Sequence, residues 1–296
     1  IHPMGVRGCP DGGDDLDLVV ARLFADKDLS RQLKLSSVNS INWCRVMVQS
    51  VHYFYAYFRV IRQVGDPVVF SVPSGAFGNL FAGYLASLMG LPVHGFICAN
   101  NENQALHRAF STGVFKKQDL IQTLSSAIDI TVPYNFWRFL YFASKRDDKK
   151  LRQWMDQFKH TGEIRLGKDL VHQVQSLFLS CSVSDGLTLE TIRQTWDDNG
   201  CLLDPHSAVA LAGAKKFRPE IVPQAQIICL ATAHPAKFPD VIKKALGPDL
   251  PDQAFHPALE QAKKGGHGNR VFEFEDLESE LVRSMGHAME KSGKTT

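Results

Sequence analysis

A glycine-containing segment, SVPSGAFGN at residues 71–79, has the residue types of a phosphate-binding loop. An apolar run over residues 68–70 predicts a buried strand immediately before it, and helix-forming residues follow to about Met89. A strand, a glycine loop and a helix start together present several backbone N–H groups beside the positive end of a helix dipole. Glycine allows a ligand to approach the backbone closely and tolerates positive φ. The predicted phosphate cradle comprises Ser74, Gly75, Ala76, Phe77, Gly78 and Asn79.

Two further loops carry polar residues of types that bind ligands. Residues 36–45, SSVNSINWCR, offer Asn39, Ser40 and Arg45, and residues 231–238, ATAHPAKF, offer Thr232. Ligands of a parallel sheet bind at the carboxyl ends of its strands, so the loops at 74–79 and 231–238 are expected to face one site. Taken singly, each loop also fits a tight turn, a helix cap or a solvated side chain.

The elements around these loops predict an α/β fold. Strands are expected at residues 68–70, within 91–101 and, buried, within 225–238, and the β–loop–α–β order is typical of a parallel sheet with crossover helices. A long helix with Ser36 or Ser37 as its cap runs towards Val60, and its nearly uniform apolar composition predicts burial. Residues 150–195 are expected to alternate helices with short loops. Asp204 and Pro205 predict a helix start.

Composition limits the classes of partner. The chain has 296 residues, 44% of them hydrophobic, and a net charge of +2, which does not favour nucleic acid or an anionic membrane as the main partner. No apolar run is long enough to cross a bilayer. Of six cysteines, Cys44, Cys98 and Cys229 lie in apolar segments and are expected in the core. No C-x-x-C or H-E-x-x-H pattern predicts a metal site, and neither a signal peptide nor an N-x-[ST] acceptor indicates secretion.

Four motifs in this order, NSINW, SVPSGAFGN, DPHSAVA and TAHPAKF, resemble threonine synthases, which are fold-type II pyridoxal phosphate (PLP) enzymes. The resemblance implies a truncated tryptophan synthase β-like scaffold, with a mostly parallel sheet flanked by helices. Residues 14–296 would form the C-terminal part of that fold, mainly the large PLP domain, behind a flexible arm at residues 1–13. The family's chemistry is elimination or replacement of phosphate on amino acids such as O-phosphohomoserine or O-phosphothreonine.

The resemblance also assigns roles to residues. Residues 74–79 would hold the PLP phosphate, and the hydroxyl of Thr232 would bind the pyridine nitrogen and leave it unprotonated. Ser40 and Arg45, together with Asn39, would hold the substrate phosphate, for which the planar guanidinium of arginine is well suited. His206 matches a motif position without an assigned role.

The family's Schiff-base lysine lies in a motif resembling H-G-P-T-x-x-F-K-D, which these 296 residues do not contain. Lys116, Lys168 and Lys237 lie in other contexts, so no catalytic residue is assigned, and PLP is expected to be absent or weakly bound. The first hypothesis is therefore a non-catalytic, cytokine-like signalling protein. It rests on resemblance to a short form of a vertebrate family member. That short form is made by alternative splicing, is secreted and promotes osteoclast formation.

That hypothesis implies secretion and an unknown cell-surface receptor, whereas the sequence pattern alone favours a cytoplasmic protein. The alternative is an incomplete fragment of a PLP-dependent phospho-lyase, and a third reading is a domain with only a structural or partner-binding role. Surfaces that meet the missing segments are expected to expose apolar area and to cause self-association. The candidate surfaces are residues 53–58 and 132–142.

Overall fold

The computed structural model describes residues 4–9, 13–37, 39, 41–264 and 270–291. The chain divides into two compact units. One unit comprises residues 38–259, and the other combines both ends of the chain, residues 1–37 and 260–296. All candidate site residues belong to the unit of residues 38–259.

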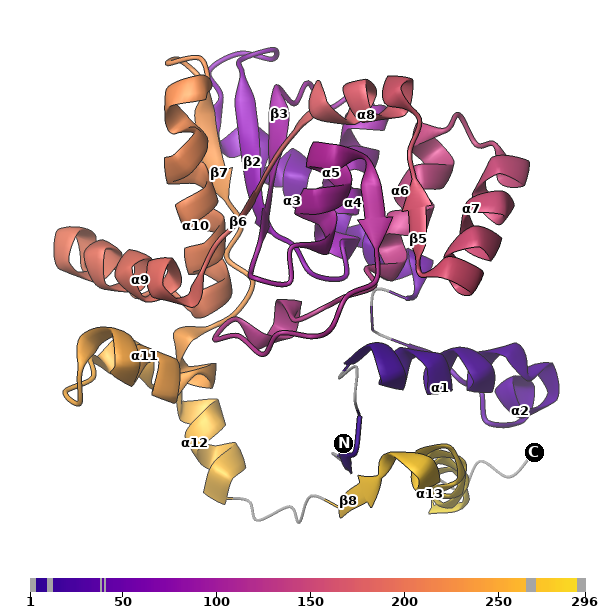
Figure 1. Ribbon diagram of the computed structural model, residues 1–296. Helices are drawn as coiled ribbons and strands as arrows, with labels where there is room; N and C mark the ends of the chain where they lie inside the picture. Colours follow the sequence, from indigo (N-terminus) through magenta and orange to yellow (C-terminus); the bar gives the residue numbers. More distant parts are fainter. Residues whose placement is uncertain (1–3, 10–12, 38, 40, 265–269, 292–296) are drawn as a thin grey trace. The chain divides into compact units, whose positions relative to one another are not determined.

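A four-stranded parallel sheet forms the centre of the unit of residues 38–259 (Figure 1). Its strands lie in the order β6-β3-β2-β7, and every neighbouring pair is parallel. Their bounds are β2 Val68–Pro73, β3 Gly95–Asn100, β6 Phe178–Ser182 and β7 Gln226–Cys229. Every residue of β2 is buried, because this central strand has neighbours on both sides and helices on both faces.

The two faces of this sheet belong to two different hydrophobic clusters. Val68, Phe70 and Val72 of β2 pack with the helices of one face, whereas Val69 packs with the helix of the other, α10 Pro205–Phe217. The first face is covered by α3 Trp43–Val60, α4 Gly78–Leu88, α5 Ala105–Thr112 and α6 Tyr134–Ala143. The second face is covered by α10 Pro205–Phe217, and α9 Asp185–Asn199 packs against α10.

The remaining elements of this unit lie around the sheet. A small antiparallel pair consists of β4 Val114–Lys116 and β5 Glu163–Arg165. The other helices are η1 Ser126–Ile128, α7 Asp148–Thr161, α8 Lys168–Gln175, η2 Arg218–Glu220, η3 Pro235–Lys237, α11 Pro239–Leu246 and η4 Asp252–Ala254. Helix α12, Pro257–Lys264, crosses the boundary between the two units.

The unit of the two chain ends has its own small core. Strand β1 Met4–Arg7 pairs in parallel with β8 Arg270–Glu273. Its helices are α1 Gly13–Ala25, α2 Lys27–Gln32, η5 Phe274–Asp276 and α13 Leu277–Lys291. Val19 and Leu23 of α1 pack with Leu277 of α13, as the helical spacing of these residues predicts. The predicted irregular arm at residues 1–13 is corrected at Met4–Arg7, where pairing with a distant strand imposes β structure.

Several predictions about individual elements were wrong. Strand β6 lies within the region predicted to hold only helices and loops, and β7 is a partly exposed edge strand rather than a buried one. The cap of α3 is Asn42, whose Oδ1 accepts a hydrogen bond from the backbone N–H of Cys44 over 3.0 Å. The Ser36 and Ser37 prediction failed because both residues precede the true helix start. Cys98 is buried as predicted, whereas Cys44 is exposed in the first turn of α3.

Helix α3 is not buried all round. It buries Val46, Ser50, Tyr53 and Tyr57 against the sheet side, and α4 contacts it along its length. Its opposite side exposes large apolar residues, namely Met47, Val48, Val51, Tyr55 and Phe58. The second predicted exposed surface, residues 132–142, is mostly core, because Phe136, Phe139 and Leu140 are buried. Within the described residues, no helix is both long and apolar enough to cross a membrane.

Candidate functional site

The phosphate cradle predicted at residues 74–79 joins the end of β2 to the start of α4. In the part of the chain that the structure describes, the backbone N–H groups of residues 75–79 have no hydrogen-bond acceptor. Buried backbone N–H groups normally have a partner, so this run of donors indicates a site for an acceptor from outside the chain. A helix N-terminus favours a negatively charged one.

The carbonyl groups of the cradle, by contrast, are occupied by the protein itself. Asn100 donates from Nδ2 to the carbonyl of Ser74 over 2.5 Å, and Asn135 donates from Nδ2 to that of Ala76 over 3.0 Å. The phenol of Tyr53 donates to the carbonyl of Asn79 over 2.9 Å. Because these side chains fix the carbonyl oxygens, the peptide N–H groups keep their orientation before any ligand arrives.

Two backbone features shape the cradle. Phe77 adopts φ of +66°, a left-handed conformation that costs energy in a non-glycine residue and is held here by burial of its ring. At Gly75, a Cβ atom would lie 2.7 Å from Cα of Ile128 and 3.1 Å from Cγ1 of Ile130. No side chain fits at that position, since the segment containing Ile128 lies directly against the glycine. We call residues 125–128, which include η1, the roof of the cradle.

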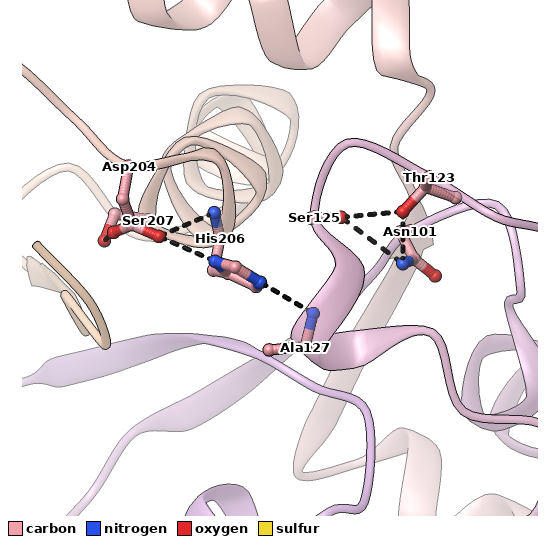
Figure 2. Close-up of polar contacts among 7 residues, drawn as sticks. All are labelled: Asn101, Thr123, Ser125, Ala127, Asp204, His206 and Ser207. Atoms are coloured by element: carbon pink, nitrogen blue, oxygen red, sulfur yellow. Dashed lines mark hydrogen bonds and ion pairs between the residues drawn. The ribbon is translucent and has the colours of Figure 1, made fainter. Parts of the chain in front are cut away.

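The roof is held from α10 by a buried aspartate and histidine (Figure 2). The backbone N–H of Ala127 donates to Nε2 of His206 over 3.0 Å, and Nδ1 of the same ring lies 2.7 Å from Oδ1 of Asp204. Burial alone would raise the pKa of Asp204, but hydrogen bonds from His206 and Ser207 outweigh it and lower the pKa below its usual value. Asp204 is therefore a carboxylate at neutral pH.

The other side of the roof is held from the end of β3 (Figure 2). Nδ2 of Asn101 donates to Oγ1 of Thr123 over 2.9 Å, to Oγ of Ser125 over 3.3 Å and to Oδ1 of Asp129 over 2.7 Å. Asn103 donates to Asp129 as well, over 3.1 Å. Burial raises the pKa of Asp129, although hydrogen bonds from Thr123 and Asn101 oppose that rise.

The second predicted loop reaches the cradle through α6. Nη1 of Arg138 donates to Oδ1 of Asn135 over 2.7 Å, and its Nη2 donates to the carbonyl of Ile41 over 2.6 Å. Asn135 in turn binds Ala76 of the cradle. The hydroxyl of Tyr134 donates to Oδ1 of Asn39 over 2.8 Å. Arg45 lies exposed in the first turns of α3, and Ser40 lies outside the described residues.

The third predicted loop follows β7 and begins, like the cradle, at the carboxyl ends of the sheet's strands. Ser71 of β2 is paired with Cys229 of β7, and the N–H of Leu230 donates to the carbonyl of Ser71 over 2.9 Å. Because the two strands are parallel neighbours, the loops that leave their carboxyl ends emerge side by side. Thr232 is exposed in this loop, so its hydroxyl is accessible to a ligand. Among the described residues, no cluster of three or more His, Cys, Asp and Glu side chains is placed to hold a metal ion.

Sequence reasoning missed the residues that join these loops. Asn135 and Arg138 lie in the segment 132–142, which the sequence predicts only as an apolar surface for self-association, and the sequence does not single out Asn101 or Asp129. A polar pair spaced i, i+3 within an otherwise apolar helix is a signal that indicates such a role, because buried polar side chains need partners. His206 was recognised as a motif residue, and the structure gives it a contact with the roof.

Known proteins agree with the motif resemblance. The family model "Threonine synthase, C-terminal" matches residues 207–283. The chain is 40% identical to threonine synthase of Pseudomonas aeruginosa over 248 residues, covering 83% of this chain and 51% of that protein. It is 39% identical to threonine synthase-like 2 of Homo sapiens over 257 residues, covering 85% of this chain and 52% of that protein. The chain thus spans about half the length of these curated relatives.

A solved structure shares the fold as well. The crystal structure of PLP-bound threonine synthase from Brucella melitensis is 35% identical, with a TM-score of 0.80, and the match covers 96% of this chain and 60% of that one. In sequence and in fold, the chain is thus similar to about half of a threonine synthase, and it has the α/β fold of the fold-type II PLP enzymes.

Proposed function

We propose that the chain is the cofactor-binding part of a PLP-dependent phospho-lyase that acts on a phosphorylated hydroxy amino acid such as O-phosphohomoserine or O-phosphothreonine. The observation that carries this proposal is the run of N–H groups at residues 75–79, at the N-terminus of α4, for which the described part of the chain offers no acceptor. A phosphate ester supplies several acceptor oxygens and negative charge, which is what these donors and the helix dipole favour.

Each part of the site has a distinct task in this proposal. Residues 74–79 would hold the phosphate of PLP, and the accessible hydroxyl of Thr232 would bind its pyridine nitrogen. PLP, when bound, supplies an electron sink for the bond changes at the amino acid. The loop of Asn39, Ser40 and Arg45 binds the substrate phosphate, and its link to the cradle through Arg138 and Asn135 sets the spacing between the two phosphates. The covalent lysine of the family comes from a segment that is not among these 296 residues.

Binding of the cofactor phosphate is tested first, with a probe that cannot react with lysines. Pyridoxamine 5′-phosphate carries an amine in place of the aldehyde, so calorimetry with the full chain reports non-covalent binding alone. We expect pyridoxamine 5′-phosphate to bind and pyridoxamine, which lacks the phosphate, to bind at least about tenfold more weakly, or about 1.4 kcal/mol. Equal affinities for the two compounds would contradict a phosphate cradle at residues 74–79.

Catalysis is tested by complementation. The full chain is mixed with PLP and with a separately produced N-terminal half of a threonine synthase, and release of inorganic phosphate from O-phosphohomoserine and O-phosphothreonine is measured. We expect release only when both halves and PLP are present. If pyridoxamine 5′-phosphate binds but the mixture releases no phosphate, the chain holds the cofactor without being part of a phospho-lyase.

The competing hypothesis is a secreted, cytokine-like signal that promotes osteoclast formation, and its support is the motif resemblance together with the exposed apolar side of α3. The enzyme proposal is favoured because the chain is as similar to a bacterial threonine synthase, at 40% identity, as to the human relative, at 39%, to within one percentage point. Osteoclast precursors treated with the pure chain distinguish the two, since the signalling hypothesis alone predicts a response.

A further inference from the structure

His206 lies in the first turn of α10, where its ring has both nitrogen atoms engaged. Nδ1 lies 2.7 Å from Oδ1 of Asp204, and Nε2 lies 3.0 Å from the backbone nitrogen of Ala127. Only 2% of the residue is exposed, and its ring centroid lies 4.9 Å from that of Phe238. The ring is therefore buried away from solvent, and its two hydrogen bonds fix its position.

These partners specify the tautomer. A backbone N–H can only donate, so Nε2 must present its lone pair to Ala127. A carboxylate can only accept, so Nδ1 must carry the proton and donate it to Asp204. Asp204 is held in turn by Ser207, whose hydroxyl donates to its other oxygen. The imidazole is thus neutral, with one defined tautomer, and its single acceptor points at the roof.

The roof contacts the cradle directly. Ile128 follows Ala127, and its Cα lies so close to Gly75 that no Cβ fits between them. We propose that His206 is a positioning residue for phosphate binding: the Nε2 lone pair holds Ala127, and thereby seats Ile128 on Gly75 so that the N–H groups of residues 75–79 keep one arrangement. This inference rests on the proposed function, because it concerns the same cradle. It adds a role for His206, which contacts the roof and not the ligand.

The contacts from β3 do not make this role redundant. Asn101 and Asn103 bind Thr123, Ser125 and Asp129, which lie on either side of the turn that contains Ala127 and Ile128. Among the described residues, the N–H of Ala127 has His206 as its acceptor. Loss of that acceptor would leave a donor facing the protein interior, and the turn would move to find another partner.

Two substitutions separate the two hydrogen bonds of the ring. In His206→Gln, the amide reaches the place of Nε2, and its oxygen can still accept from Ala127. In His206→Asn, the shorter amide reaches only the place of Nδ1, so contact with Asp204 remains and the acceptor for Ala127 is lost. The measured quantities are the exchange rate of the Ala127 amide proton, the amide chemical shift of Gly75 and the affinity for pyridoxamine 5′-phosphate, all on the full chain.

We expect His206→Asn to speed exchange at Ala127, to shift the Gly75 resonance and to weaken pyridoxamine 5′-phosphate binding about tenfold or more, equivalent to about 1.4 kcal/mol. His206→Gln is expected to stay near the wild type in all three. If both variants behave alike, or if the Gly75 resonance does not respond, the proposal is overturned. Should neither variant fold, the nitrogen-15 spectrum of the wild-type ring decides, because a proton on Nε2 rules the proposal out.

The failure of the proposed function gives a different pattern. If the wild-type chain does not bind pyridoxamine 5′-phosphate while exchange at Ala127 and the Gly75 shift respond only to His206→Asn, the cradle has no affinity for this cofactor. The roof contact is then established without a role in binding, and the positioning proposal falls together with the phosphate assignment. If the wild type binds the probe and both variants bind equally well, only the positioning proposal falls.

Discussion

Asn135 and Arg138 lie one helical turn apart on α6, and Nη1 of Arg138 donates a hydrogen bond to Oδ1 of Asn135 over 2.7 Å. The pair joins two loops that are distant in the sequence, because Asn135 also binds Ala76 of the cradle and Arg138 also binds Ile41. Asn135 is fully buried, and burial lowers the pKa of the Arg138 guanidinium. The spacing between the two proposed phosphate sites thus depends on this pair.

Replacement of Arg138 by lysine tests that link. A lysine retains the charge but lacks the planar fork that binds Asn135 and Ile41 together, so the loop at residues 39–45 should lose its fixed distance from the cradle. We expect Arg138→Lys to lower the free energy of unfolding by about 1–3 kcal/mol, as for other buried hydrogen-bonded groups that lose a partner. Urea denaturation measures it. Arg152→Lys, at an exposed residue on α7, is the control and should be neutral.

Replacement of Gly75 by alanine tests the fit of roof and cradle. The added methyl group would lie 2.7 Å from Cα of Ile128, so either the roof or the peptide at residue 75 must move. We expect the affinity for pyridoxamine 5′-phosphate to fall by about tenfold or more, or about 1.4 kcal/mol. Gly167→Ala, where a Cβ meets no atom within 4 Å, serves as the matched control for calorimetry. Unchanged binding in Gly75→Ala would show that the roof does not shape the cradle.

The cradle could be predicted from sequence because its determinants are local. A buried run, a glycine loop and a helix start follow one another within residues 68–88, and no distant segment is needed to recognise them. The sequence also predicts that the cradle and the loop of Thr232 lie at the same end of the sheet, because both follow the carboxyl ends of parallel strands. The roof and its anchors were not, because Ala127 and His206 meet only after α10 has packed on the sheet.

Other elements escaped prediction for physical reasons that their residues show. In β6, Phe178 and Cys181 are buried while the residues between them are only partly covered, so neither strand alternation nor a continuous apolar run is present. Strand β1 depends on pairing with β8 at the other end of the chain. In α3, apolar composition could not reveal which side of the helix meets the sheet and which remains uncovered.

Replacement of Gly83 by alanine tests the contact between α3 and α4. Helix propensity alone predicts stabilisation of about 1 kcal/mol for glycine to alanine in a helix. Here the methyl group would lie 2.5 Å from Cε1 of Tyr53 and 2.8 Å from Cε1 of Phe96, so we expect a loss of about 1–3 kcal/mol instead. Gly186→Ala on the exposed start of α9 is the control and should not destabilise. A stabilised Gly83→Ala variant would mean that Tyr53 is not packed tightly against α4.

The exposed side of α3 predicts association between chains. Val48, Val51, Tyr55 and Phe58 are 57–67% exposed and lie three or four residues apart, which places them on one side of the helix. We expect a dimer or larger species at micromolar concentration by light scattering. Tyr55→Glu should reduce its mass, whereas Met155→Glu on α7 should not. A monomeric wild type at that concentration would contradict the association.

The pH dependence of stability tests the charges on the two sides of the roof. Hydrogen bonds from His206 and Ser207 outweigh burial and lower the pKa of Asp204, so Asp204 stabilises the fold above the unfolded value of about 3.9, and this contribution is lost as pH falls below it. Burial raises the pKa of Asp129, so Asp129 acts in the opposite sense, and stability is lost as pH rises from about 3.9 through the raised value.

The substitutions Asp204→Asn and Asp129→Asn should therefore change the pH profile in opposite directions. On acidification, the free energy of unfolding should fall less steeply than in the wild type for Asp204→Asn, and more steeply for Asp129→Asn. Urea denaturation at a series of pH values measures both slopes, and the comparison of slopes is independent of any constant loss of stability in either variant. If Asp204→Asn leaves the slope unchanged, the pKa of Asp204 is not lowered on folding, and the hydrogen bonds from His206 and Ser207 do not outweigh its burial.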